Sequence, residues 1–249
     1  MLRLLILLFI GFPCLLFSQD VNQLLKEAQL QESLFHENES FLRYAEILKK
    51  DPNNLVALWK CSELSSRIGA RQPDIENKRP YFYAAKKYAT AALRVSPNST
   101  DANYAMALAL GRVSLLAGSR ERVMLAKEVK YYADKAVRLD PNNFRAYHIL
   151  GRWNYEVSNL NFAEKSFARL FYGSLPAASL EEAIRDFERS RFLNPGFILN
   201  YLELARSYHR MDENKKAIAN LHTLLALPNL IYDDTRAKVI ARQMLTDWQ

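Results

Sequence analysis

Residues 201–229, YLELARSYHRMDENKKAIANLHTLLALPN, contain two short apolar patterns separated by a polar turn at 211–214. Within each pattern the apolar residues recur every three or four positions, which places them on one face of an α-helix. These residues are Tyr201, Leu204, Ala205 and Tyr208 in the first pattern and Ala217, Leu221 and Leu224 in the second. Because the small Ala205 and Ala217 would let two helices approach closely, the stretch predicts a pair of antiparallel helices.

The same pattern recurs along the chain, and each copy ends at a proline. Proline has no backbone N–H and a fixed φ, so it stops one helix and prepares the start of the next. The prolines in question are Pro52, Pro97, Pro141, Pro195 and Pro228, which lie 45, 44, 54 and 33 residues apart. The last spacing is close to a helix–turn–helix repeat period of about 34 residues, and the longer spacings indicate insertions.

A shared stop and a shared packing pattern resemble the tetratricopeptide repeat. One helical pair cannot cover its own apolar face, so such pairs stack into a curved array. We therefore predict an all-α fold, a tetratricopeptide-type α-solenoid of about five helical hairpins with a C-terminal capping helix. The predicted repeat domain covers residues 19–249, with approximate units 20–54, 55–99, 100–143, 144–196 and 197–229 and a capping helix at 233–248.

The start of the chain differs from the rest. One positive charge precedes an almost unbroken apolar run, residues 4–17, which is short for a membrane span but suits the apolar core of a signal peptide. The small Ser18 precedes the polar Gln19, so we predict a signal peptide over residues 1–18 and an exported protein, periplasmic or extracellular. Two alternatives stay open: a membrane anchor formed by residues 4–17, and a lipoprotein site at Cys14.

Composition narrows the class of partner. The 249-residue chain has a formal net charge of +7, and loss of residues 1–18 would leave +6 because Arg3 goes with them. This charge favours anionic partners, but lysines and arginines are spread along the chain rather than gathered in runs, so we predict no nucleic-acid partner. Cys61 would be the one cysteine left, and it is expected to be a buried, inert thiol.

A second resemblance is more specific. Residues 151–157, GRWNYEV, are similar to the GRW-x-YEV segment of the regulator of microtubule dynamics family. The likeness covers about residues 100–230 and includes the segments 164–165, 172–176, 180–183 and 194–197. The resemblance implies a helical repeat domain used for contact with protein or phospholipid, in some members on a membrane-anchored protein. Because an exported chain would not meet microtubules, microtubule binding is not expected.

In tetratricopeptide arrays the first helix of each hairpin lines the concave surface. When these helices are aligned on the small residues Gly111, Gly151 and Ala205, the next residue is an arginine each time. Guanidinium groups bind carboxylates and phosphates through two parallel hydrogen bonds, so the row predicts a ligand-binding surface in the C-terminal part of the groove. The predicted groove residues are Arg112, Arg145, His148, Arg152, Tyr155, Arg206, His209 and Arg210.

An alternative interpretation makes these arginines structural. Partly buried arginines are usually paired, and Glu156 and Glu203 lie close enough in sequence to form ion pairs with them. The aligned position in the second unit is Glu63, which is acidic rather than basic. Both interpretations stay open.

No motif for catalysis, metal binding or a cofactor is present in the sequence. The four histidines are not spaced as metal ligands, and no glycine-rich phosphate loop or nucleophile motif occurs. We therefore predict no catalytic residue, no metal and no cofactor, and we predict that the chain is not an enzyme.

Two insertions, 69–80 and 158–178, interrupt the repeat pattern. The first contains a predicted polar loop, residues 69–74, before a helix that opens at Tyr81 after Pro80. The second is predicted to contain a short helix at 163–172. The alternative for the insertions is a lengthened helix followed by a connector. Insertions in solenoids often contact the ligand.

The sequence favours an exported, non-enzymatic scaffold that holds a protein or peptide segment in its groove, with an acidic segment as one option. The alternative is a membrane-contact protein that binds anionic phospholipid headgroups, as the family resemblance implies.

Overall fold

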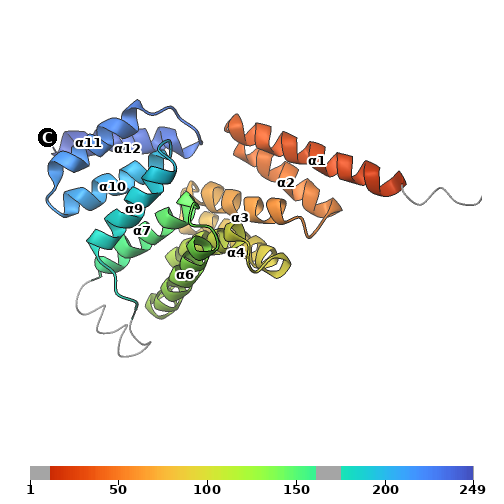
Figure 1. Ribbon diagram of the computed structural model, residues 1–249, viewed down its shortest axis with the longest axis horizontal. Helices are drawn as coiled ribbons and strands as arrows, with labels where there is room; N and C mark the ends of the chain where they lie inside the picture. The colour runs from red at the N-terminus through yellow and green to blue at the C-terminus, as the bar shows by residue number, and fades with distance from the viewer. Residues whose placement is uncertain (1–11, 161–174, 249) are drawn as a thin grey trace, which may run out of the picture.

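The computed structural model describes residues 12–160 and 175–248, and these residues form eleven α-helices, one short 3-10 turn and no strand. The helices pair in chain order, and the predicted all-α solenoid of helical hairpins is confirmed (Figure 1). The pairs are α1 (Phe12–Ser33) with α2 (Glu37–Lys50), α3 (Leu55–Ala70) with α4 (Ile75–Val95), α5 (Thr100–Val113) with α6 (Ser119–Leu139), α7 (Phe144–Ser158) with α9 (Leu180–Leu193), and α10 (Ile198–Arg210) with α11 (Asn214–Ala226), followed by α12 (Asp233–Trp248).

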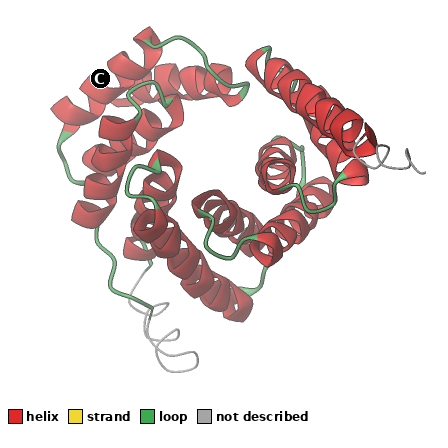
Figure 2. Cartoon of the chain, turned by 45° about the vertical axis from the view of Figure 1, so that its right-hand side comes forward, coloured by secondary structure: helices red, strands yellow, loops and turns green. Residues whose placement is uncertain are grey.

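The hairpins follow one another around a turn of a superhelix (Figure 2). The first helices α3, α5, α7 and α10 contact one another in that order, and each also contacts the second helix of the preceding hairpin. We call the side of the superhelix that these four helices share the inner face. The second helices α4, α6, α9 and α11 form the outer layer.

The turn between hairpins explains the recurring proline. In the two copies that read Asp-Pro-Asn-Asn, the last asparagine is the N-cap of the next helix: the Asn54 side chain accepts a hydrogen bond from Ala57 N at 3.1 Å, and the Asn143 side chain accepts one from Ala146 N at 3.0 Å. The motif therefore ends one helix and caps the next within four residues.

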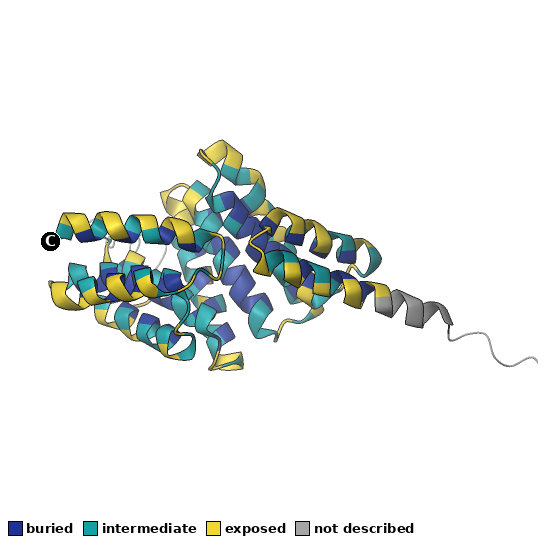
Figure 3. Ribbon diagram, turned by 90° about the horizontal axis from the view of Figure 1, so that it is seen from above, coloured by how far each residue is buried: buried dark blue, intermediate teal, exposed yellow. Residues whose placement is uncertain are grey.

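Close helix contacts depend on small residues. Gly151 lies against the Phe187 ring, and a Cβ atom at this position would come within 2.6 Å of the ring carbons. Ala183 and Ala217 are fully buried in the same hydrophobic cluster as Phe187. Figure 3 shows buried segments where the helices lie against one another and exposed segments on their outer sides. The small–large packing pattern of the sequence is thus the contact between hairpins.

The predicted polar loop at 69–74 is confirmed in part, as a connection over residues 71–74, and the predicted helix start at Tyr81 is wrong. Helix α3 runs to Ala70, and Asp74 caps α4 by accepting a hydrogen bond from Asn77 N at 2.9 Å, so α4 begins at Ile75 and contains Pro80. A polar cap therefore starts this helix earlier than the proline does. Helices α4 and α6 both have 21 residues, against 13 in α11, and these longer second helices account for most of the extra length in the 45- and 44-residue proline spacings.

The predicted cleavage point after Ser18 lies inside α1, which is helical from Phe12 to Ser33. From Val21 onward α1 packs against α2 and α3, with Leu24 and Ala28 buried in the same cluster as Tyr44. Residues 1–11 and the predicted short helix at 163–172 lie outside the described residues. In the described part of the chain, no helix combines the length and the apolar character that a membrane span requires.

The superhelical turn brings its two ends together. The Arg71 guanidinium in the turn after α3 forms an ion pair of 3.0 Å with Asp233, the first residue of α12, and lies 4.6 Å from the centre of the Tyr232 ring. Arg67 of α3 also reaches Asp233, at 3.8 Å. The N-terminal hairpins and α12 accordingly lie next to each other in Figures 1 and 2.

Candidate functional site on the inner face

The first helices can be aligned on their N-caps, which are Asn54, Ser99, Asn143 and Phe197. At the same distance from each cap lies a buried small residue: Ser62, Ala107, Gly151 and Ala205. A Cβ atom at Gly111 would meet nothing within 4 Å, so Gly111 is not the close-contact residue of α5. The alignment on Gly111 therefore placed α5 one helical turn away from its true position. When the helices are aligned on their N-caps, Arg112 of α5 corresponds to Arg67 of α3.

One group of charged side chains lies where the superhelix closes, and we call it the balanced cluster. Its eight members are Glu32, Glu37, Lys60, Glu63, Arg67, Arg71, Arg145 and Asp233, four of each sign. Arg67 and Arg71 both donate to the buried Glu37 carboxylate. Every cation in this cluster has at least one carboxylate partner.

Glu63 is the centre of the balanced cluster and is only 4% exposed. Lys60 Nζ lies 3.3 Å from its carboxylate, Arg145 Nε lies 3.5 Å away, and the Tyr104 hydroxyl donates a hydrogen bond of 2.8 Å. Burial raises the pKa of Glu63, but the charges of Lys60, Arg145 and Arg67 outweigh it and lower the pKa to about 2. Arg145, a predicted groove residue, is thus engaged in an internal ion pair.

The second group, which we call the arginine cluster, consists of Arg112, Arg152, Glu156, Glu203 and Arg206. A single carboxylate oxygen, Glu203 Oε1, accepts from Arg152 Nη1 at 3.2 Å and from Arg206 Nη1 at 3.0 Å. Arg152 Nη2 also lies 3.3 Å from Glu156, whose side chain is 61% exposed. These contacts confirm the ion pairs of the structural interpretation. The cluster has three cations and two anions.

Arg112 is the cation without a partner. Among the described residues it forms no ion pair and no hydrogen bond, and its Nε atom is buried. Burial lowers the pKa of the Arg112 guanidinium to about 10, and the charge of Arg152 lowers it as well, while Asp233, Tyr104 and Glu203 act in the opposite direction from beyond contact distance.

His148 lies beside the arginine cluster but is held by packing. Asn200 donates from Nδ2 to Phe187 O at 2.7 Å, so its Oδ1 faces His148 Nδ1 at 3.0 Å and that nitrogen carries the proton. The imidazole also packs edge-on against Phe197 with a centroid distance of 4.9 Å. Burial lowers the pKa of His148 to about 4, so the ring is neutral at physiological pH.

The other three predicted groove residues lie away from both clusters. Arg210 donates to Tyr155 O and to Ser158 Oγ at 3.3 Å and covers the Tyr155 ring, which ties the end of α10 to the end of α7. His209 stacks on Trp248 of α12 at 3.9 Å. The structure therefore brings together Arg112, Arg152, Arg206 and His148, with Arg145 in the neighbouring cluster.

Sequence reasoning missed most of the balanced cluster. Arg67 could have been found by aligning the first helices on their caps, because it then falls in the same place as Arg112. Arg71 and Asp233 carry no local signal, since they are 162 residues apart and meet only through the curvature of the whole array.

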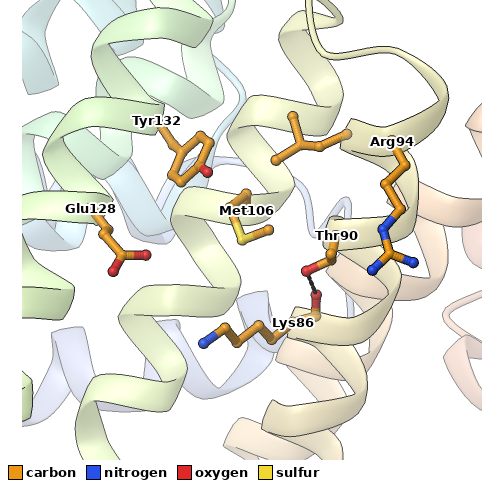
Figure 4. A pocket seen from close by; sticks show the side chains of 7 residues that line it. Lys86, Thr90, Arg94, Met106, Glu128 and Tyr132 are labelled. Carbon is orange, nitrogen blue, oxygen red and sulfur yellow. Dashed lines mark hydrogen bonds between the residues drawn. The ribbon is translucent and has the colours of Figure 1, made fainter.

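A pocket of about 350 Å³ lies in the outer layer, between α4 and α6, and was not predicted (Figure 4). Leu93 and Met106 give it apolar surface, while Lys86 and Glu128 supply opposite charges. Thr90 donates to Lys86 O at 2.8 Å and is therefore already engaged. The remaining lining residues are Arg94 and Tyr132.

No group of three metal-binding side chains occurs in residues 12–160 and 175–248. Cys61 is free and buried, and burial raises its pKa to about 12, which keeps the thiol protonated and unreactive.

Residues 22–249 match the family model described as "Regulator of microtubule dynamics protein 1-3". The chain belongs to this family. It is 29% identical over 189 residues to "Regulator of microtubule dynamics protein 3" of Xenopus laevis, covering 76% of this chain and 41% of that protein. It is 26% identical over 217 residues to "Regulator of microtubule dynamics protein 1" of Caenorhabditis elegans, covering 84% of this chain and 94% of that protein.

Among solved structures, the chain is similar to a thermophilic tetratricopeptide protein of Thermus thermophilus. The TM-score is 0.67 at 14% identity, with 91% of this chain and 99% of that one covered. Both resemblances drawn from the sequence, to the tetratricopeptide fold and to the family, are confirmed.

The prediction of an exported, periplasmic or extracellular protein is contradicted by these relatives. They come from animals and are named for the regulation of microtubules, a filament system inside cells, whereas a periplasm belongs to bacteria. The apolar run at 4–17 met the length and composition expected of a signal peptide, but composition by itself does not identify export. Without export, there is no reason to expect that the chain does not meet microtubules.

Proposed function

We propose that this chain is a non-catalytic scaffold that takes part in the regulation of microtubule dynamics, and that its inner face binds a protein segment displayed on microtubules. The observation that carries the proposal is the convergence of partly exposed arginines from α7 and α10 on one face. The side chains of Arg152 and Arg206 are 41% and 36% exposed. Helical repeat arrays use such concave surfaces to hold extended partners.

Two further points support the proposal. The names of the relatives tie the family to microtubules. The chain spans 41% of the Xenopus protein, so the proposal concerns what this repeat domain contributes and not the whole of that protein. In addition, the charged side chains of the inner face are already positioned by ion pairs on helices that pack against one another. Binding would therefore restrict few further side chains.

Co-sedimentation with microtubules polymerised from purified tubulin tests the proposal. Wild-type chain is expected in the pellet, and Arg206→Glu is expected to leave it, because the new carboxylate faces Glu203 and repels an anionic partner. Arg185→Glu is the matched control, since Arg185 in α9 has a 72% exposed side chain on the outer layer and the charge change is the same.

Urea unfolding of both variants checks that each one is folded. If wild-type chain stays in the supernatant, or if both variants pellet as wild type does, the proposed use of the inner face is wrong.

A further inference from the structure

We infer that Arg112, with Arg152 beside it, forms a binding site for one side-chain carboxylate of an acidic protein segment. The inference rests on the proposed function of the inner face and names the chemistry of the partner.

The first step is that an arginine that is partly buried and unpaired lowers the stability of the fold, and Arg112 is such a residue. A charged group removed from water without a partner destabilises the fold, and folded proteins normally pair such groups. The neighbouring balanced cluster follows this rule, since each of its four cations reaches a carboxylate. Arg112 departs from this pattern on the same face of the molecule: its side chain is half-buried and its Nε atom is fully buried, yet it reaches no carboxylate among the described residues.

The second step is that the local fold compensates Arg112 only in part. It lies in the last turn of α5, where the carbonyl ends of the helix favour a cation. That effect is worth less than about 1 kcal/mol at an exposed site. Arg138 holds the same position in α6 but is exposed to water. It therefore has the same favourable interaction with the helix dipole and keeps its hydration.

The third step is the size of the missing charge. The arginine cluster has three cations and two anions, so one negative charge would balance it. A carboxylate carries one charge, whereas a phosphate monoester carries about two at neutral pH. The Arg112 guanidinium makes no hydrogen bond among the described residues; its Nε atom is buried, and the two Nη groups are left to hold both oxygens of a carboxylate. The balanced cluster has no cation to spare, which places the site in the arginine cluster.

A direct test uses a dye-labelled hexaglutamate peptide and its hexaglutamine counterpart in fluorescence anisotropy titrations. Wild-type chain is expected to bind the first and not the second, with affinity that falls as salt is added. Arg112→Gln is expected to weaken binding about tenfold or more, as for loss of a hydrogen-bonded charge pair. Arg112→Lys keeps the charge but not the two-pronged geometry and should fall between.

Arg138→Gln is the matched control, with the same charge change at the same helical position, and it should bind as wild type does. Thermal unfolding separates binding from folding: without peptide, Arg112→Gln should melt at or above the wild-type temperature, because it removes a half-buried charge that no carboxylate balances. A variant that melts lower and binds less would show a structural role, and the inference would be overturned.

Equal peptide affinity for wild type and Arg112→Gln also overturns the inference, while the loss of microtubule pelleting in Arg206→Glu would leave the proposed function standing. Vesicles that contain phosphatidylserine form a further arm. If they bind through Arg112 and the peptide does not, the site takes a lipid headgroup and the acidic-segment inference is wrong. Peptide binding through Arg112 without microtubule pelleting would instead contradict the proposed partner alone.

Discussion

The two charged clusters of the inner face solve the same electrostatic problem differently. In the balanced cluster, Glu63 and Glu37 are almost fully buried, and each is surrounded by cations. In the arginine cluster, one buried carboxylate, that of Glu203, serves two arginines and a third arginine has none. The ion pairs of the first cluster join the two ends of the superhelix, whereas the second cluster is the one that we propose a partner completes.

The largest expected effect comes from breaking the centre of the balanced cluster. Glu63→Gln removes the charge that Lys60 and Arg145 share and leaves two cations with poor compensation, so we expect a loss of about 3 kcal/mol in the free energy of unfolding. The matched change in the other cluster is Glu156→Gln. That carboxylate is well exposed, and its loss should cost less than about 1 kcal/mol.

Urea unfolding of the two variants measures both values. Equal losses at Glu63 and Glu156 would mean that the clusters do not differ in their contribution to stability, and the comparison would fail.

The next largest effect is the pH dependence of stability that His148 gives to the region of the arginine cluster. His148 faces Asn200, Glu203, Arg152 and Arg112, and burial keeps it neutral with a pKa of about 4 against 6.5 when unfolded. The unfolded chain therefore binds a proton that the folded chain does not, so stability is present above pH 6.5 and is lost as pH falls towards 4. We expect His148 to contribute a loss of about 1.5 kcal/mol between pH 6.5 and pH 5.

His148→Gln keeps a neutral group that can donate to Asn200 and removes the titration. Urea midpoints of both proteins across this pH range should show a shallower decline in the variant. Parallel curves would show that His148 is not the titrating group.

The smallest effect concerns the ion pair that closes the superhelix. Arg71 and Asp233 are about one-fifth exposed, so a double-mutant cycle with Arg71→Gln and Asp233→Asn should give a coupling free energy of about 0.5–1 kcal/mol. The coupling should shrink with added salt. A coupling near zero at low salt would show that the balanced cluster does not help to close the array.

The architecture could be predicted from the sequence because repeat packing is local. The prolines mark where hairpins end, and residues such as Gly151 and Ala205 mark where they touch, so pattern and contact coincide. Two local errors have local causes. Gly111 is small and is therefore predicted to be the contact residue of its helix, but the buried small residue at that position is Ala107. Pro80 predicts the start of a helix, but Asp74 caps that helix and starts it earlier.

The site was less accessible to such reasoning. The sequence indicated arginines on the inner face, and Arg152 and Arg206 are there, but it could not tell which of them would meet a carboxylate. Pairing depends on how far each helix is displaced along its neighbour, which sets Arg145 beside Glu63 and leaves Arg112 alone. Single-sequence spacing contains no information on that displacement.

The ion pair between Arg71 and Asp233 is sensitive to the pitch of the superhelix. These residues are 162 positions apart in sequence, and the hairpins between them each add a small rotation to the array. An ion pair near 3 Å forms only when those rotations add up to the right total, so a slight change of angle at any one joint would separate the two ends. A partner that changes the angle between two neighbouring hairpins should therefore break the ion pair between Arg71 and Asp233 before it disturbs other contacts.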